Sequence, residues 1–426
     1  MNQGKYVFSQ VVEFIPRYQF DKLVRQYKGD WHVKNLNSYN HLLHLLYGQL
    51  TGCDSLRDIC LCLDVHTNML YHLGFRKTVS HTSLSRANEN RDYRIFEGMG
   101  IYLIDLVRPL YSKVKLSDIT IDNVIYALDS TTISTSIKLA TWAFGKYSKG
   151  AVKMHTLLDL RGSIPANIHI TDGKWHDSNE LDELKPEPYA FYVMDKAYVD
   201  LKALYAFHKA QAFWVSRPKE NMQFATLEQM EITDAKSGIL EDSRIKVTGY
   251  KSSKLYPEDM RFVRIYDPEN DAIVEFISNN FEVSAAEIAN LYRHRWDIEV
   301  FFKWIKQNIT VKNLWGYSEN AVKIHLWTAI ISYLMVARIK ADYECPYSIT
   351  EVATLIRISE WKEPTCGLYL PNRTRQSIQT IMSKNALYLM IFKLSRFYRT
   401  SSNEKTIIER IASVGKRCSP WNYQVE

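Results

Sequence analysis

Four polar side chains stand at helix-compatible spacing between residues 292 and 306, and their types could bind phosphate and metal. They are Tyr292, Arg295, Glu299 and Lys306. At about 100° per residue, these spacings place all four within roughly a 60° arc of one continuous helix. The carboxylate could hold a metal ion there, and the two cations could hold phosphates. The alternative interpretation is a solvated charged face with ordinary ion pairs.

A helix carrying these residues has its own start signal and its own buried face. Ser284 precedes Glu287 by three residues, which predicts a capping box at the first turn. An apolar stripe lies on the adjacent arc and would pack into a core. Its members are Leu291, Ile298, Phe302, Ile305 and Ile309.

Two upstream aspartates follow short, continuous apolar runs. Residues 124–128 precede Asp129, which leads into a turn-like Ser-Thr-Thr, and residues 190–194 precede Asp195. Such runs are typical of strands that are buried on both faces of a sheet. An aspartate at a strand end is often only a helix cap or a turn former. Two in this order before a helical glutamate favour a shared catalytic site.

The spacing Tyr-x2-Arg-x3-Glu-x6-Lys, with both aspartates before it, resembles the signature of insertion-sequence transposases of the family numbered four. These form a branch of the ribonuclease H-like DDE recombinases. The resemblance implies an α/β fold, with a ribonuclease H-like mixed sheet and flanking helices. A β-rich insertion would interrupt the sheet, and a helical N-terminal domain would precede it.

The resemblance also assigns roles to the residues. Asp129, Asp195 and Glu299 would be catalytic and would bind metal, whereas Tyr292, Arg295 and Lys306 would bind DNA. Two ions roughly 3.5–4 Å apart can activate an attacking oxygen and stabilise a leaving one. Mg²⁺ prefers hard oxygen ligands, so Mg²⁺ is the expected cofactor, with Mn²⁺ as a substitute. Asp129 would bridge the ions.

Composition and charge agree with this expectation. The chain has 426 residues, of which 46% are hydrophobic, so it can form two or three domains with a large core. Its net charge of +7 divides into +4 for residues 1–118, −3 for 119–359 and +6 for 360–426. Basic ends around a slightly acidic middle fit a metal-binding body with DNA-binding flanks, although many proteins that bind no nucleic acid share such a pattern.

Nothing in the sequence predicts secretion or a membrane anchor. The N-terminus lacks a signal-peptide layout, and the six cysteines form no CxxC pair, which indicates the reduced thiols of a cytoplasmic protein. The resemblance implies a bacterial protein associated with the nucleoid. The longest apolar stretch, residues 326–339, is too short to span a bilayer and predicts a buried helix.

The first 110 residues predict a helical DNA-binding domain. An apolar pattern over residues 8–15 is broken at Pro16, and residues 42–47 belong to a strongly apolar helix. A Ser- and Thr-rich turn then leads into a polar helix within residues 74–91, which favours a helix-turn-helix-like module over a plain surface helix. Residues 8–18 resemble the N-terminal domain of these transposases, whose implied task is to bind terminal inverted repeats.

After Asp129 a strand hairpin is expected over residues 152–160 and 166–171, and its Lys153-x-His155 matches a pattern of the family. The following segment, residues 173–178, resembles a family loop beside the active site. His176 and Asp177 could form a metal pair there. A loop with a helix cap is the favoured interpretation, because the three carboxylates already supply enough ligands.

The domain boundaries follow from these patterns. The N-terminal domain covers residues 1–110, and the ribonuclease H-like domain covers 119–340, with the insertion at about 217–282. That insertion is too long for an ordinary loop, and it contains a predicted hairpin at 261–265 and 273–277. Residues 341–426 form a basic C-terminal extension, and beyond residue 360 the sequence matches nothing in the family.

The function expected is metal-dependent cut-and-paste transposition by a DDE transposase. It would cleave at terminal inverted repeats, pass through a hairpin and transfer the strand into target DNA, as a homodimer in the synaptic complex. One alternative is an inactive or domesticated DNA-binding derivative. The other is a structure-selective nuclease of the same fold, which would keep the carboxylates without needing the Tyr-Arg-Glu-Lys spacing.

Overall fold

A computed structural model describes residues 6–135, 150–232, 238–268, 270–308 and 314–359. The described chain divides into two compact units. Unit 1 takes in the described residues of 1–99, 313–316 and 324–426, and unit 2 takes in those of 100–312 and 317–323. The predicted domain boundaries at 110, 119 and 340 remain a prediction.

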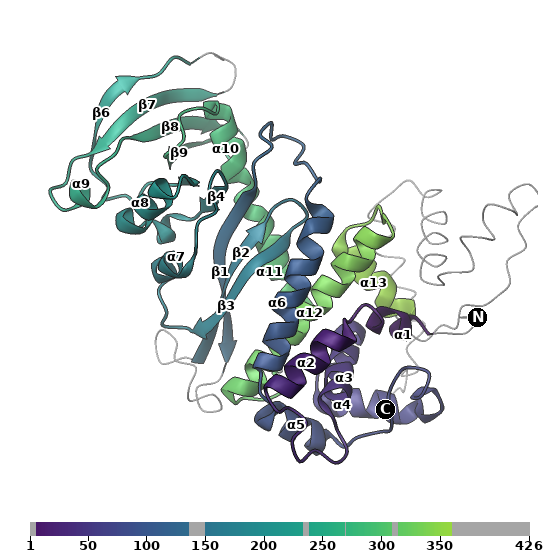
Figure 1. Ribbon diagram of the computed structural model, residues 1–426. Coiled ribbons are helices and arrows are strands. Elements are labelled where there is room, and N and C mark those ends of the chain that lie inside the picture. Colours follow the sequence, from purple (N-terminus) through teal and green to yellow (C-terminus); the bar gives the residue numbers. More distant parts are fainter. Residues whose placement is uncertain (1–5, 136–149, 233–237, 269, 309–313, 360–426) are drawn as a thin grey trace, which may run out of the picture. The chain divides into compact units, whose positions relative to one another are not determined.

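Unit 1 is helical in its described part, as expected (Figure 1). The apolar pattern before Pro16 forms α1, and the proline stands at the N-cap of α2. The side chain of Asn37 caps α3, and Gly52 ends that helix with a φ of 77°. The helices are α1 (Val7–Val12), α2 (Arg17–Gln26), α3 (Ser38–Thr51), α4 (Leu56–Val65), the 3₁₀ turn η1 (Thr67–Met69), α5 (His81–Asn90), α12 (Glu319–Asp342) and α13 (Ile349–Ser359).

The segment before α5 does not form the predicted helix-turn-helix-like module. Helix α5 is present and is capped by Ser80, but fifteen residues with a 3₁₀ turn separate it from α4. A helix-turn-helix uses a turn of about three or four residues. The side chain of Asn88 is also unavailable to DNA, because it is buried and bonded to His41 and to the carbonyl of Trp315.

Helix α12 is longer than the apolar stretch predicted it to be. It is the one helix in the described residues with the length and composition of a membrane span, yet 89% of its most apolar window is buried inside the protein. Burial of that kind is typical of a core helix. Its ends fall outside the predicted stretch because they carry charged residues, Glu319 and Lys323 at the start and Lys340 and Asp342 at the end. The polar residues Thr328 and Ser332 within it bond back to carbonyls one turn earlier.

Unit 2 is built on one mixed sheet, whose described strands follow the order β3-β2-β1-β4-β5-β9-β8-β7-β6 (Figure 1). Strands β1, β4 and β5 are parallel, and every other neighbouring pair is antiparallel. The strands are β1 (Ile125–Thr135), β2 (Gly150–Asp159), β3 (Ile164–Asp172), β4 (Phe191–Met194), β5 (Phe213–Ser216), β6 (Phe224–Gln229), β7 (Ile239–Val247), β8 (Met260–Asp267) and β9 (Ala272–Ser278). The predicted α/β class with a mixed sheet is confirmed.

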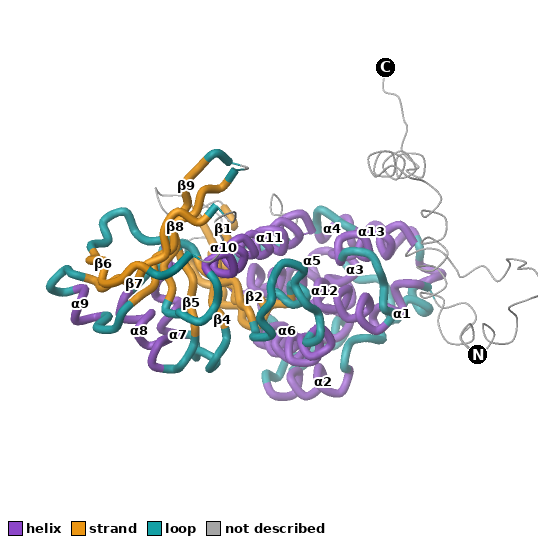
Figure 2. The backbone as a smooth tube through the Cα atoms, turned by 90° about the horizontal axis from the view of Figure 1, so that it is seen from above, coloured by secondary structure: helices purple, strands orange, loops and turns teal. Residues whose placement is uncertain are grey.

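Helices flank this sheet, and α10 and α11 follow one another beside its strands (Figure 2). The helical elements of unit 2 are α6 (Arg94–Val107, begun in unit 1), η2 (Arg108–Tyr111), η4 (Asp177–Asn179), α7 (Glu180–Glu183), η5 (Lys196–Tyr198), α8 (Leu201–Lys209), α9 (Ser252–Leu255), α10 (Ala285–Arg293), η6 (His294–Trp296) and α11 (Asp297–Asn308). Strand β4 is buried along its whole length, as its continuous apolar run predicts.

The predicted β-rich insertion extends the sheet. Its hairpin forms β8 and β9, and β9 pairs with β5 at Val215 with Ser278 and Ser216 with Ile277. Strand β5 would otherwise be an unpaired edge, so β9 satisfies its backbone groups. A buried ion pair lies within the insertion, where Arg261 of β8 binds Asp242 of β7 at 2.7 Å. Arg261 also donates to the carbonyl of Val283, just before the N-cap of α10, and this bond ties the insertion to the next helix.

Candidate active site

Asp129 and Asp195 lie at equivalent places on adjacent parallel strands. The pairing of β1 with β4 ends at Leu128 and Met194, and each aspartate is the next residue. Strand β4 ends at Met194, and Asp195 is the N-cap residue of the 3₁₀ turn η5. The side chain of Asp195 makes no capping hydrogen bond to this turn. The sheet therefore opens at this point on the β4 side of β1.

The predicted turn after Asp129 is wrong. Residues 130–135 continue β1, paired with β2 from Ser130 opposite His155 to Thr135 opposite Gly150. Ser-Thr-Thr is compatible with a strand as well as with a turn, and the long hairpin partner decides between them. Asp129 consequently lies inside β1, at the position where the strand keeps one neighbour and loses the other.

The helix that carries Glu299 is divided by a 3₁₀ turn. Tyr292 belongs to α10, Arg295 to η6, and both Glu299 and Lys306 to α11. The single helical arc predicted for these four residues is therefore wrong, because 3₁₀ residues advance about 120° each instead of 100°. The predicted apolar stripe is buried at Leu291, Ile298, Phe302 and Ile305. Ile309 lies outside the described residues.

His294 is the first residue of this 3₁₀ turn. Its imidazole lies between two carboxylates, with Nε2 2.6 Å from Asp118 and Nδ1 2.8 Å from Asp297. The hydrogen bonds that His294 donates to Asp297 and then to Asp118 raise its pKa, against the effect of burial. Because Asp118 precedes β1, this contact ties the 3₁₀ turn to the entry of the central strand.

The predicted capping box is only half formed. Ser284 caps α10 by accepting from the backbone of Glu287 at 3.1 Å. The carboxylate of Glu287 does not return the bond to Ser284. It is buried and accepts from the backbone of Thr120 at 2.7 Å and of Ile121 at 3.3 Å, so it holds α10 to the segment that enters β1.

Arg295 joins the candidate carboxylates. Its Nη1 donates to Asp129 at 3.1 Å, and its Nη2 donates to Glu299 at 3.1 Å. The arginine side chain is 9% exposed, whereas those of Asp129 and Glu299 are 20% and 42% exposed. This buried guanidinium thus offsets the charge of one carboxylate on β1 and one on α11.

The pKa of Asp129 is raised to about 6. Burial is the largest cause, and the charges of Asp195 and Glu299 add to it, against the bond from the Ser130 amide and the charge of Arg295. Burial likewise raises the pKa of Tyr292, with a contribution from Asp195 and an opposing one from Arg295. The three carboxylates and the tyrosine therefore lie within electrostatic reach of one another.

A cleft of about 430 Å³ opens beside this group. Its walls come from β1 and α11, and they are Asp129, Ser130, Thr131, Glu299, Phe302, Lys303, Lys306 and Gln307. Lys306 is exposed at this cleft. The structure thus brings Asp129, Glu299 and Lys306 together, while Tyr292 is buried against Phe276 with its ring 5.0 Å away.

The donor chemistry of the site suits a divalent cation. Carboxylate oxygens are the ligands that Mg²⁺ prefers, and Asp129 and Glu299 both line the cleft. In the described residues no three His, Cys, Asp or Glu side chains are already arranged around one metal position. Arg295 supplies the positive charge between Asp129 and Glu299 instead.

The loop before α7 differs from its predicted role. Asp177 opens the 3₁₀ turn η4 without capping it, and its carboxylate instead accepts from Ser130 at 2.6 Å and from Lys153 at 2.9 Å. His176 is exposed. Lys153 and Asp177 were each noted in the sequence, but nothing in their spacing predicts that the two side chains bind each other across a strand hairpin.

Comparison with known proteins assigns the chain to a family. The transposase DDE domain matches residues 121–335, half of the chain, so the chain belongs to that family. Residues 3–76 match a domain of unknown function, DUF4372.

Three related proteins are named as transposases. A Sinorhizobium fredii protein named as transposase y4zB is 32% identical over 212 residues, covering 49% of this chain and 59% of that protein. A Geobacillus stearothermophilus protein named as the transposase of insertion sequence element IS5377 is 29% identical over 209 residues, covering 49% and 55%. A Synechocystis protein named for the element IS4SA is 28% identical over 276 residues, covering 63% and 75%. The chain thus spans little more than half the length of the first two relatives.

A solved structure, the cryo-EM structure of the piggyBac transposase synaptic complex with hairpin DNA, aligns over 89% of this chain and 83% of its own. The sequence identity is 10% and the TM-score is 0.39.

Proposed function

We propose that this chain is a DDE transposase that cleaves DNA at the ends of its element and joins them to target DNA. The observation that carries the proposal is that Arg295 binds both Asp129 and Glu299. Asp195 directly follows β4 at the same level of the sheet, where the pairing of β4 with β1 ends. A ribonuclease H-like sheet with three such carboxylates suits phosphodiester cleavage. The family match over residues 121–335 supports the same reaction.

In this proposal Asp129, Asp195 and Glu299 hold divalent metal, Mg²⁺ with Mn²⁺ as a substitute. The metal, when bound, would activate the attacking oxygen and stabilise the leaving one. Arg295 offsets the charge of Asp129 and Glu299, and it would also contact a phosphate of the DNA. Lys306 lies exposed at the cleft wall and would bind a neighbouring phosphate.

The finer parts of the proposal concern DNA and assembly. Tyr292 and Arg295 would contact phosphates near a distorted end, and the reaction would pass through a DNA hairpin. The helical N-terminal domain, predicted over residues 1–110, would bind the terminal inverted repeats. A homodimer would hold two ends together in the bacterial cytoplasm.

The DNA that flanks the gene provides the test. Inverted repeats within a few hundred base pairs, next to a short duplicated target, would identify the substrate. The full chain should then nick end-labelled repeat DNA in Mg²⁺, form a hairpin and join the end to a plasmid. Nicking without a hairpin or joining would favour the nuclease alternative, and binding without cleavage would favour the inactive derivative.

A further inference from the structure

Asp177 connects the segments that follow both candidate aspartates. On one side it accepts a 2.6 Å hydrogen bond from Ser130, whose own amide donates to the carboxylate of Asp129 at 2.7 Å. On the other side it accepts from the hydroxyl of Tyr198 at 3.4 Å. The amide of Tyr198 in turn donates to the carbonyl of Asp195 at 3.0 Å. One carboxylate thus touches the residue beside Asp129 and the turn that begins at Asp195.

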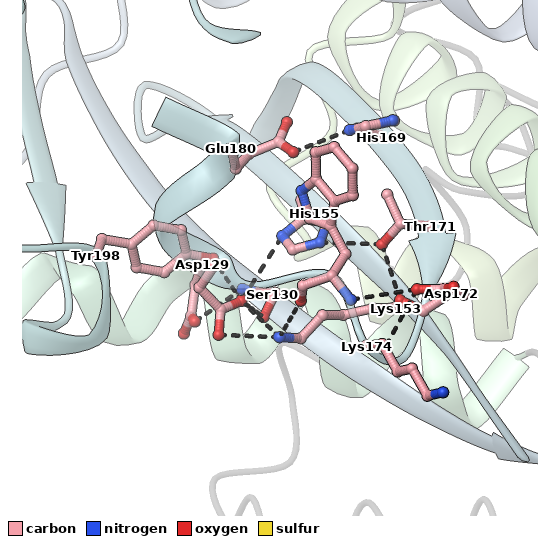
Figure 3. A network of polar contacts seen from close by, with 12 residues as sticks. Asp129, Ser130, Lys153, His155, His169, Thr171, Asp172, Lys174, Glu180 and Tyr198 are labelled. Atoms are coloured by element: carbon pink, nitrogen blue, oxygen red, sulfur yellow. Dashed lines mark hydrogen bonds and ion pairs between the residues drawn. The ribbon is translucent and has the colours of Figure 1, made fainter. Parts of the chain in front are cut away.

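The surroundings of Asp177 keep it charged and fixed. Lys153 on β2 binds it at 2.9 Å and also donates to the carbonyl of Trp175 at 3.3 Å. Burial raises the pKa of Asp177, but the hydrogen bonds from Ser130 and Lys153 outweigh it, so that its pKa is lowered overall. Figure 3 shows how Ser130, Lys153 and Tyr198 converge from three different elements next to Asp129.

We infer that Asp177 is a positioning residue, which fixes Asp129 through Ser130 and the turn after Asp195 through Tyr198. This inference rests on the proposed function of the two aspartates. Partners of metal-binding side chains orient those side chains, and their loss typically costs about 10–100-fold in metal affinity or activity. Mg²⁺ demands near-ideal octahedral geometry, so carboxylates held loosely should serve it poorly.

A merely structural role for Asp177 makes a different prediction. Asp172, the last residue of β3 before this loop, provides the matched control, because its carboxylate accepts from the nearby amides of Lys174 and Trp175. If Asp177 only folds the loop, Asp177→Asn and Asp172→Asn should behave alike. If Asp177 positions the site, only Asp177→Asn should alter the metal response.

The experiment compares the full-length wild type, Asp177→Asn, Asp172→Asn and Ser130→Ala. Mn²⁺ binding is measured by calorimetry without DNA, and single-turnover nicking of repeat DNA is measured in Mg²⁺ and in Mn²⁺. Asp177→Asn should lose about tenfold or more in nicking with Mg²⁺ and in Mn²⁺ affinity, and Mn²⁺ should restore part of the rate. Asp172→Asn should stay within about twofold of the wild type.

Ser130→Ala keeps the Lys153 ion pair, so it tests the link if Asp177→Asn fails to fold. It should reproduce the Mg²⁺ defect, and combining it with Asp177→Asn should add little. Equal losses in Asp177→Asn and Asp172→Asn, or near wild-type nicking in both Asp177→Asn and Ser130→Ala, would overturn the inference while leaving the transposase function standing. If the wild type nicks no repeat DNA, the proposed function is overturned. The Mn²⁺ affinities of the wild type and the variants would still test the positioning role of Asp177.

Discussion

The guanidinium of Arg295 lies 3.1 Å from the carboxylate of Asp129, although 166 residues separate them in the chain. The contact joins the central strand of the sheet to the 3₁₀ turn before α11. Because Arg295 also holds Glu299, a divalent cation and this arginine would compete for the same two carboxylates.

This competition predicts the behaviour of Arg295→Gln. The variant keeps some hydrogen-bonding capacity but removes the positive charge, so Mn²⁺ affinity should be equal to or higher than that of the wild type. Nicking should nevertheless fall about tenfold or more, since the arginine would also contact phosphate. Calorimetry with Mn²⁺ and a nicking assay measure the two effects. A tenfold loss of Mn²⁺ affinity would mean that Arg295 organises the carboxylates instead of competing for them.

Each of the three proposed metal ligands should be indispensable. Asp129→Asn, Asp195→Asn and Glu299→Gln keep side-chain shape but lose charge, so each should reduce nicking in Mg²⁺ by more than about 100-fold. End binding in a gel-shift assay should stay within a few-fold. Asp182→Asn, an exposed carboxylate of α7, is the control. A variant that cuts at nearly the wild-type rate would remove its residue from the proposed site.

Lys306→Ala should separate nicking from the later steps. Lys306 is exposed at the cleft beside Asp129 and Glu299, where it would hold the phosphate next to the scissile one. Its loss should impair hairpin formation and strand transfer more than initial nicking, because the DNA must then bend back on itself. Denaturing gels resolve the three products, and Lys202→Ala on α8 is the matched exposed control. An equal loss at every step would indicate a simple contribution to DNA affinity.

The buried ion pair of the insertion predicts a large stability effect. Arg261 and Asp242 are 3% and 4% exposed, so Arg261→Met should leave an unpaired buried charge and lower the free energy of unfolding by about 3–5 kcal/mol. Arg264→Met, on the same strand, removes pairs to Glu241 and Glu275 that are more exposed and should cost at most about 1 kcal/mol. Urea unfolding followed by tryptophan fluorescence measures both. Similar losses in the free energy of unfolding of both variants would show that burial gives the Arg261–Asp242 pair no larger effect than the exposed pairs of Arg264.

Unit 1 should lose stability in acid because of three buried histidines. Burial lowers the pKa of His44 to about 4 and of His325 to about 3, and it also lowers that of His41 well below its usual value. The unfolded chain takes up protons below about pH 6.5 that the folded unit cannot, so stability is present above that pH. It should fall by about 1.4 kcal/mol per pH unit for each histidine as the pH drops toward 4.

Thermal melting between pH 7.5 and 4.5 tests this expectation. His325→Phe keeps an aromatic ring against Trp315, which lies 4.2 Å from the histidine ring, and should flatten the pH dependence. His176→Asn, at an exposed position, should leave it as in the wild type. A melting temperature that does not change across this range would contradict the assignment of neutral buried histidines.

Local patterns predicted the elements better than the contacts between them. The apolar runs before Asp129 and Asp195 specify buried strands, and Ser284 specifies a helix start, because each depends on neighbouring residues alone. The continuation of β1 past Asp129 depends on a partner strand more than twenty residues later. The 3₁₀ turn makes its contact through His294 with Asp118, far upstream in the chain. Such long-range pairings leave no periodicity for a sequence pattern to reveal.

The same limit applies to the candidate site. Residue types and spacing selected the three carboxylates and the cations near them, whereas the bridge by Arg295 and the network at Asp177 required the packed chain. Residues 360–426, predicted to extend the protein as a basic tail, lie outside the described residues.

The join between β5 and β9 makes the β-rich segment an outgrowth of the sheet. Ser216 and Ile277 are directly paired, so the chain leaves and re-enters the sheet at the same edge. In outline this is a β-hairpin whose connection carries three further strands, and buried side chains of β7 and β8 share one core with those of β1 and β4. The exposed outer strand β6 is therefore the part that a lineage of such enzymes could vary while inheriting the strands that carry Asp129 and lead to Asp195 unchanged.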